Sequence, residues 1–156
     1  MARYTAIAEG VASGTALKTI LQIANDANRQ TVVYGIRVSF KGTSSTAEPV
    51  RTVLMRQSSA GTGGSSLTSN YGPNKLDPGS PSSTVTCLKG PSGTWTAEPT
   101  AGEVVWAQEI HPQAGWGEYI PLGDEIVVAA SGRLAVVVTA AATVNVTAQL
   151  YWREGH

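Results

Sequence analysis

The segment from Thr31 to Lys41 alternates between apolar and polar or small side chains over most of its length. Because successive side chains of an extended strand point to opposite faces, this period of two predicts a β-strand with one buried face. Such a strand needs neighbours to pair with and a second layer to cover its apolar side. The residues expected on the buried face are Val32, Tyr34, Ile36, Val38 and Phe40.

The rest of the chain is also rich in strand-forming residues and turn signals. Forty of the 156 residues are Thr, Val or Ile, the β-branched types that favour strands over helices. Turn signals recur at intervals of roughly 8–12 residues, a spacing typical of sandwiches and barrels. We therefore expect an all-β fold: an antiparallel β-sandwich, jelly-roll-like, with about eight or nine strands. The further strands are expected at 17–23, 50–57, 84–89, 104–110, 119–122, 125–129, 133–140 and 143–152.

The chain has the length of a single domain that can bury its own core. Residues 1–15 are mostly small and polar and are interpreted as an N-terminal arm, and residues 16–156 as one sandwich domain. Within that domain, fifteen of the 26 residues from 57 to 82 are Gly, Ser or Pro. A connection so long without periodicity is unusual in a compact domain, so we expect a surface excursion there. Its expected anchors are Leu67, Tyr71 and Leu76.

Charge is balanced and sparse along the chain. Eleven basic residues stand against eleven acidic ones, and we expect no nucleic-acid partner because such a protein needs a basic stripe to neutralise phosphates. Charged residues make up 14% of the chain, against about 25% in typical soluble domains. A surface so low in charge is what a subunit of an assembly can tolerate. Neither a membrane-spanning run nor a signal-peptide pattern is recognisable, so we expect no membrane partner.

Residues that carry catalysis or bind metals are scarce. The Gly-x-Ser-x-Gly spacing is absent, and the two histidines are His111 and His156. A Ser-His-Asp arrangement through His111 stays open because triads assemble in space, but we favour a solvated or interface histidine in a loop. Cys87 is the only cysteine; it is expected to be a buried apolar residue and cannot supply a Cys/His zinc site. We expect no enzyme, no cofactor and no metal.

Tryptophan is frequent for a chain of this length, with four residues beside a single phenylalanine. Trp106 and Trp152 lie in apolar strand segments and are expected in the core. Trp116 lies between two glycines in a segment interpreted as a loop. Exposed tryptophan is typical of contact hot spots, although Trp116 folding back to cap the end of the sandwich is an equally good interpretation. The candidate interface residues are Arg3, Tyr4, His111, Trp116 and Tyr119.

Several short motifs follow one another along the chain: Lys18-Thr19-Ile20-Leu21-Gln22-Ile23, Ile36-Arg37-Val38-Ser39-Phe40-Lys41-Gly42, Thr46-Ala47-Glu48-Pro49-Val50, Thr96-Ala97-Glu98-Pro99-Thr100, His111-Pro112-Gln113, Pro121-Leu122-Gly123 and Gly132-Arg133-Leu134. In this order they resemble a family of small virion proteins of tailed bacteriophages that infect actinobacteria and similar hosts. The similarity spans most of the chain.

This resemblance implies a capsid decoration, or cementing, protein without catalytic residues. By resemblance, the chain would form a homo-oligomer, a trimer, that binds the major capsid protein on the outer surface of the virion. It would staple neighbouring capsid subunits together and so stabilise the phage head. Attachment through three copies would give high avidity from modest single contacts.

Two other functions stay open. Jelly rolls also occur in phage tails and baseplates, and a fold does not determine a function. A tail or baseplate component is therefore one alternative. The other is a carbohydrate-binding module in which Trp95, Trp116 and Tyr119 form a stacking platform, which predicts a planar row of exposed aromatic rings.

Overall fold

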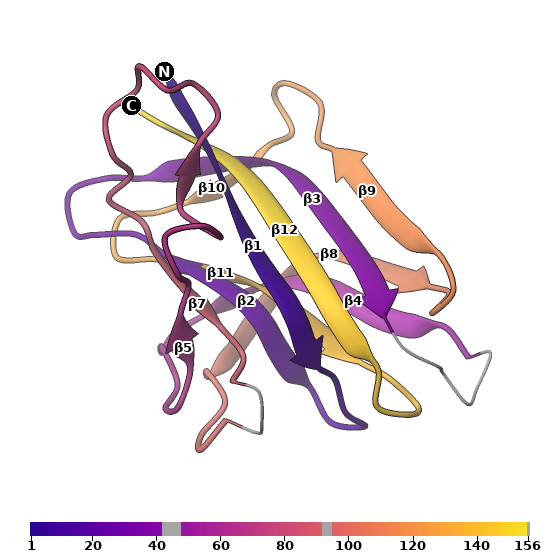
Figure 1. Ribbon diagram of the computed structural model, residues 1–156. Helices are drawn as coiled ribbons and strands as arrows, with labels where there is room; N and C mark the ends of the chain where they lie inside the picture. The colour runs from indigo at the N-terminus through magenta and orange to yellow at the C-terminus, as the bar shows by residue number, and fades with distance from the viewer. Residues whose placement is uncertain (42–47, 92–94, 156) are drawn as a thin grey trace.

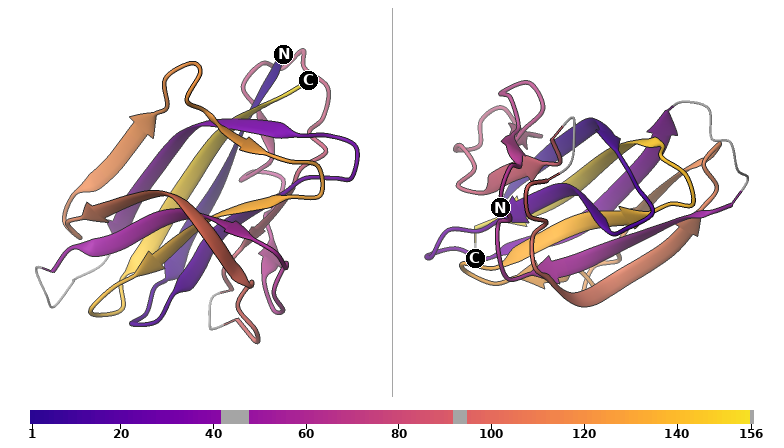
Figure 2. Two further views of the ribbon diagram at one scale, coloured as in Figure 1. Left: turned by 180° about the vertical axis from the view of Figure 1, so that it is seen from behind. Right: turned by 90° about the horizontal axis from the view of Figure 1, so that it is seen from below.

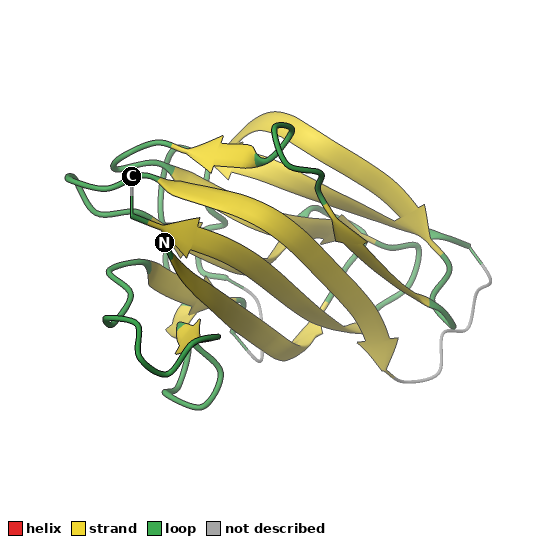
Figure 3. Ribbon diagram, turned by 90° about the horizontal axis from the view of Figure 1, so that it is seen from above, coloured by secondary structure: helices red, strands yellow, loops and turns green. Residues whose placement is uncertain are grey.

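The computed structural model describes residues 1–41, 48–91 and 95–155. Gly42, Thr46 and Ala47 of the sequence motifs, and His156, lie outside the described residues. Two antiparallel sheets of six strands each pack face to face (Figure 1), and none of the described residues is helical (Figure 3). The expected antiparallel β-sandwich is confirmed. The strands are β1 (Ala2–Ala12), β2 (Lys18–Ala24), β3 (Thr31–Lys41), β4 (Val50–Gln57), β5 (Ser65–Ser66), β6 (Asn74–Lys75), β7 (Thr86–Lys89), β8 (Ala101–Ile110), β9 (Gly115–Tyr119), β10 (Ile126–Val128), β11 (Arg133–Thr139) and β12 (Asn145–Glu154).

The order of the strands is that of a jelly roll. The first sheet runs β10-β3-β12-β1-β6, with β9 also paired to β3, and the second runs β5-β7-β2-β11-β4-β8. The longer strands pair in a nested way: β1 with β12, β2 with β11, β3 with β9 and β10, and β4 with β8. Successive pairs alternate between the two sheets, so the chain wraps around one core as a folded ribbon (Figure 2).

One difference from the expected strands lies in the glycine-rich segment after β8. β3 and β4 begin and end at the predicted residues. The strand expected at 119–122 lies instead at 115–119, where it pairs with β3 as β9. Gly115 and Gly117 hide the alternation because they carry no side chain. The described residues form twelve strands rather than eight or nine, in part because the excursion contains two two-residue strands, β5 and β6.

Residues 1–15, expected as a separate arm, belong instead to the sandwich. β1 pairs with β12 over nearly its whole length and also with β6. The side chains of Tyr4, Ala6 and Ala8 are buried in the core. The prediction was wrong because alanine on a buried face carries little hydrophobic signal in the sequence, although its small size suits a closely packed interior.

The excursion from 57 to 82 closes the side of the sandwich where β1 and β2 lie. β5 pairs with β7 in the second sheet, and β6 pairs with β1 in the first. Leu67 packs against the core as expected. Tyr71 and Leu76 are attached through backbone hydrogen bonds to β1, of 2.8 and 2.9 Å, and their side chains are exposed.

A β-bulge in β3 places Tyr34 on the face opposite to the one expected. The consecutive residues Tyr151 and Trp152 of β12 pair with Gly35 and Val33, so Tyr34 is an extra residue in the ladder. Val33 therefore faces the core, and the ring of Tyr34 packs outside with Tyr151. The expected burial is wrong for Tyr34 and right for Ile36, Val38 and Phe40, which pack in or against the core. Val32 is buried as expected but lies outside the main core cluster.

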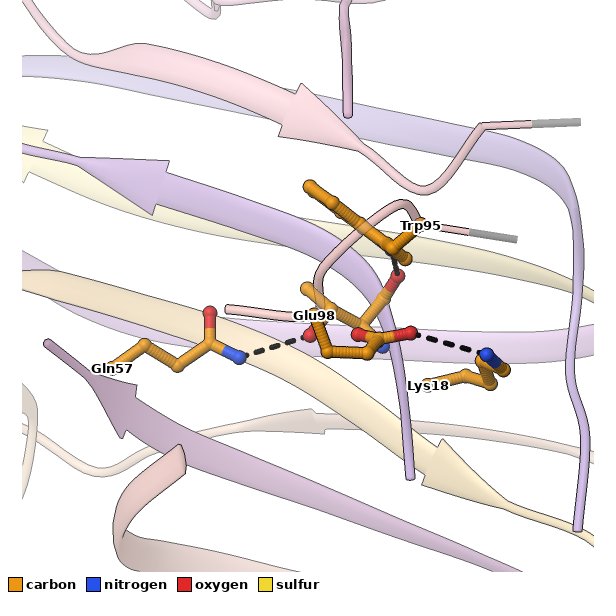
Figure 4. A network of polar contacts seen from close by, with 5 residues as sticks. Lys18, Gln57, Trp95 and Glu98 are labelled. Carbon is orange, nitrogen blue, oxygen red and sulfur yellow. Dashed lines mark hydrogen bonds and ion pairs between the residues drawn. The ribbon is translucent and has the colours of Figure 1, made fainter. Parts of the chain in front are cut away.

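Trp95 is buried and belongs to a polar network at the start of β2 (Figure 4). Its indole N–H donates to the Thr19 carbonyl at 3.0 Å, and the Gln57 amide donates to the Thr19 hydroxyl at 2.9 Å. The carboxylate of Glu98 accepts a hydrogen bond from the Thr19 N–H at 3.1 Å and lies 3.4 Å from the Lys18 ammonium. These contacts tie the loop before β8 and the end of β4 to β2.

We predict that Trp95→Phe lowers the free energy of unfolding by roughly 1–3 kcal/mol, because the buried Thr19 carbonyl loses its indole donor. Urea denaturation followed by circular dichroism measures the change. Trp116→Phe is the matched control: this residue is 43% exposed, so the change stays within about 0.5 kcal/mol. Equal losses in both variants would contradict the structural role of the Trp95 indole.

Cys87 is buried in the core, as expected. Burial raises the pKa of its thiol from an ordinary value of 9.0 to about 12, and the charge of Glu154 adds to the shift. The thiol therefore stays protonated at pH values where an exposed cysteine forms the reactive thiolate.

This raised pKa predicts a loss of stability at alkaline pH. The thiol of the unfolded chain ionises near pH 9, whereas the thiol of the folded chain stays neutral up to about pH 12. The unfolded state is therefore favoured progressively across this interval. We expect Cys87→Ala to lack this contribution, so that the difference in unfolding free energy between wild type and variant shrinks as pH rises above 9. Urea denaturation at a series of pH values measures it, and a difference independent of pH would argue against the buried neutral thiol.

Candidate binding surface

The outer face of the first sheet presents side chains from four strands in cross-strand rows. Directly paired residues of neighbouring strands point to the same face, so the register determines which side chains meet. Three adjacent rows of paired residues lie on the face of the first sheet that points away from the core. They are Thr5, Tyr151, Gly35 and Tyr119; Ile7, Gln149, Arg37 and Gly117; and Thr147, Ser39 and Gly115.

Three tyrosines pack together on this face, Tyr34 from β3, Tyr119 from β9 and Tyr151 from β12. The rings of Tyr34 and Tyr119 are stacked, with centroids 6.3 Å apart and 16° between their planes. The Tyr151 ring is tilted against both, at 6.2 and 5.6 Å. Gly35 makes room for the cluster, because a Cβ at this position would lie 2.8 Å from the Tyr119 ring. The bulge and the glycine together bring the three rings into contact.

Arg37 lies over this tyrosine cluster. Its guanidinium carbon is 5.7 Å from the ring centroids of both Tyr119 and Tyr151. Its Nη2 donates a hydrogen bond to the Tyr119 hydroxyl at 3.3 Å. Contacts of a cation with two aromatic rings hold the guanidinium in place on the sheet.

Arg153 lies over the third ring of the cluster. Its guanidinium carbon is 5.7 Å from the centroid of Tyr34, and its Nη2 pairs with the carboxylate of Glu125. The pKa of Glu125 is lowered, mainly by a hydrogen bond from the Gly123 N–H, with Arg153 adding to the effect. The ion pair therefore stays charged at neutral pH.

Burial raises the pKa of the Tyr34 and Tyr151 hydroxyls and outweighs the neighbouring arginines, which lower it. Both hydroxyls are therefore neutral at physiological pH. The cluster offers ring surface and neutral hydroxyls, and the positive charge of this face comes from the arginines. Such a surface is suited to binding rather than to proton transfer.

A hollow of about 430 Å³ lies beside Tyr119, within the range of roughly 300–1,000 Å³ typical of ligand sites. β9 contributes Gly115, Trp116, Gly117 and Tyr119 to its lining. The two glycines carry no side chain, and the Arg37 side chain lies against Gly117. The lining residues with polar side-chain groups are Arg37, Ser39, Trp116, Tyr119, Thr147 and Gln149. Among the described residues, no Asp or Glu lines the hollow.

A second hollow, of about 230 Å³, lies where the loop between β9 and β10 meets the sheet. Arg3, Tyr34 and Leu122 are among the residues that line it. Leu122 is 85% exposed and Tyr119 57% exposed, and exposed apolar side chains that gather on one surface mark interaction sites. Protein contact surfaces are typically enriched in tyrosine and arginine, and these residues here lie beside exposed apolar groups.

The two candidate interface residues of the N-terminal segment, Arg3 and Tyr4, lie in different environments. Arg3 lines the second hollow and stays on the outer face. Tyr4 is only 1% exposed; its ring stacks on Trp152 at 6.1 Å and its hydroxyl donates to the Pro81 carbonyl at 2.8 Å. Tyr4 therefore stabilises the core and is withdrawn as a contact residue.

Trp116 and Tyr119 both line the first hollow, and His111 is not among its lining residues. In β9, Trp116 pairs with Val38 and Tyr119 with Gly35, so the two aromatic side chains leave opposite faces of the strand. His111 is exposed in the turn after β8, where its Nδ1 accepts a hydrogen bond from the backbone of residue 113 at 3.2 Å. With Trp95 buried, the predicted row of three exposed rings for a carbohydrate site is not formed by these residues.

The surface also includes Tyr34, Arg37 and Tyr151. These three residues were not predicted to belong to a site. Strict alternation assigned Tyr34 to the core, and nothing local connects Arg37 with Tyr151. One signal was present in the sequence. Gly35 interrupts a strand pattern, and glycine inside a strand often marks a bulge or a close approach of another group.

Within residues 1–41, 48–91 and 95–155, no group of three or more His, Cys, Asp or Glu residues could hold a metal ion, and no helix is long and apolar enough to cross a membrane. Comparisons with known protein families, with curated proteins and with solved structures find no match. The surface is therefore interpreted from its own chemistry.

We predict that Gly35→Val disrupts the tyrosine cluster, because its Cβ would approach the rings of Tyr119 and Tyr151 to 2.8 and 3.2 Å. Near-ultraviolet circular dichroism should lose part of the tyrosine signal while the far-ultraviolet β spectrum is retained. Gly14→Ala is the control, since its added Cβ meets only the Lys18 side chain at 3.4 Å. An unchanged tyrosine signal in Gly35→Val would show that the rings do not depend on this glycine.

Proposed function

We propose that this chain is a structural virion protein, a capsid decoration protein that binds the outer surface of a phage head and stabilises it. The observation that carries the binding part of this proposal is the outer face of the first sheet, where tyrosines, arginines and exposed apolar side chains gather. The assignment to a phage particle is supported by the resemblance of the sequence motifs. In this proposal the partner is the major capsid protein and the location is the virion surface.

The tyrosine cluster suits a docking surface on energetic grounds. Its rings and arginines are carried by paired strands, and each guanidinium already lies over a ring. Fewer side chains then need to be immobilised when a partner binds, so less conformational entropy is lost. Tyrosine and arginine are also among the residue types that contribute most to protein interfaces.

A homo-oligomer, a trimer, is part of the same proposal. Three linked copies of this surface would bind a capsid with an avidity well above that of one copy. Because each copy then needs only a modest contact, the small surface of a single chain is sufficient.

A tail or baseplate component is the second candidate within a phage particle, since the same surface could dock on either assembly. The carbohydrate-binding module is less favoured, because Trp95 is buried and Trp116 and Tyr119 leave opposite faces of β9. Binding of a polysaccharide that depends on Tyr119 would revive it.

We predict that purified particles of the phage that encodes this chain contain it in hundreds of copies, as quantified by mass spectrometry. A handful of copies would indicate the tail, and complete absence would refute the virion proposal. Tyr119→Ala should greatly reduce the number of copies on the head, because it removes the most exposed ring of the cluster. Tyr71→Ala is the matched control, an exposed tyrosine on the excursion; equal occupancy for both variants would place the contact elsewhere.

A further inference from the structure

We infer that the hollow beside Tyr119 receives a carboxylate side chain, an Asp or Glu, from the protein that docks on this face. This inference rests on the proposed function and adds the chemistry of the partner. Three observations support it: the state of Arg37, the shape and lining of the hollow, and the charge of the surrounding face.

Arg37 is an anchored cation without an acidic partner in the described part of the chain. The ion pairs found there involve Lys18, Arg56 and Arg153. Arg37 instead contacts two tyrosine rings and the Tyr119 hydroxyl. A guanidinium has five N–H donors in a planar fork, and one bond to a hydroxyl leaves most of them available. A fork of this kind matches the two oxygens of a carboxylate.

The hollow gives a carboxylate access to this guanidinium. Gly115 and Gly117 present only backbone beside Arg37, so a side chain can reach the sheet surface without displacing another. The hydroxyls of Ser39 and Thr147 also line the hollow and can donate to the remaining oxygen lone pairs. Its volume of about 430 Å³ exceeds the size of a single carboxylate, so the carbon chain that carries it also fits.

The charge of the face favours an acidic partner. The two hollows are lined by three arginines, Arg3, Arg37 and Arg153. Among the described residues that line either hollow, Glu125 is the single acidic one, and it already pairs with Arg153. Complementary charge across an interface increases specificity and the rate of association. The exposed side chains of Tyr119 and Leu122 offer apolar contacts to residues that flank the carboxylate. An acidic protein segment is thus favoured over a free anion, which would use only the hollow.

The test measures binding of the full chain to heads purified from a phage that lacks its gene. Co-sedimentation at several salt concentrations compares the wild type with Arg37→Gln, Arg37→Lys and Arg51→Gln. We expect Arg37→Gln to weaken binding by about tenfold or more and to reduce its dependence on salt. Arg37→Lys should be intermediate, because it keeps the charge and loses the fork. Arg51→Gln, which removes an exposed arginine of the second sheet, should bind like the wild type.

A second variant tests the hollow without changing charge. Thr147→Tyr adds a ring to the outer face of β12, and it should weaken binding as strongly as Arg37→Gln while the thermal unfolding midpoint stays close to that of the wild type. Unchanged binding in this folded variant would overturn the inference.

The outcomes separate the inference from the proposed function. If the wild type does not bind heads, the proposed function fails. If the wild type binds and Arg37→Gln binds equally well, docking stands and the carboxylate site is overturned. If Arg37→Gln weakens binding with an unchanged salt dependence, Arg37 only positions Tyr119, which also overturns the inference.

Discussion

The pairing of β1 with β12 joins the two ends of the chain inside the first sheet, and most of the structure depends on it. This ladder runs from Ala2 and Glu154 to Ala12 and Asn145. It places Tyr4 against Trp152 in the core and leaves the carboxylate of Glu154 buried, where the Trp152 indole and the Ser83 hydroxyl donate to it. Closing a loop of nearly the whole chain costs conformational entropy, and burial of both strands between neighbours offsets it.

The same pairing builds the outer surface. Alternate residues of β12 point inward to the core and outward to the rows that contain Tyr151 and Gln149. One bulge at Tyr34 then shifts the alternation within β3, so that a tyrosine joins the outer rings and Val33 takes its place inside. A single extra residue therefore decides which aromatic side chains are available to a partner.

This origin of the surface bears on the proposed function. Contact residues on paired strands are held more rigidly than residues on long loops, and here Gly35, Gly115 and Gly117 shape the space between them. The excursion from 57 to 82, which the sequence predicted to lie on the surface, pairs with both sheets on the side of β1 and β2. The binding surface proposed here therefore lies on the sheet itself.

The sequence by itself determined the class of fold and the environment of several residues. The alternation in β3 and β4, the β-branched composition and the spacing of turns were enough for a jelly-roll-like sandwich, and the apolar surroundings of Cys87 and Trp152 were enough to place them inside. Only the tertiary structure decided that Ala2–Ala12 form a strand of the sandwich, that Tyr34 faces outward, and that Arg37, Tyr119 and Tyr151 meet. The reason is physical: these outcomes depend on the register between segments far apart in the chain, and a local pattern carries no information about register.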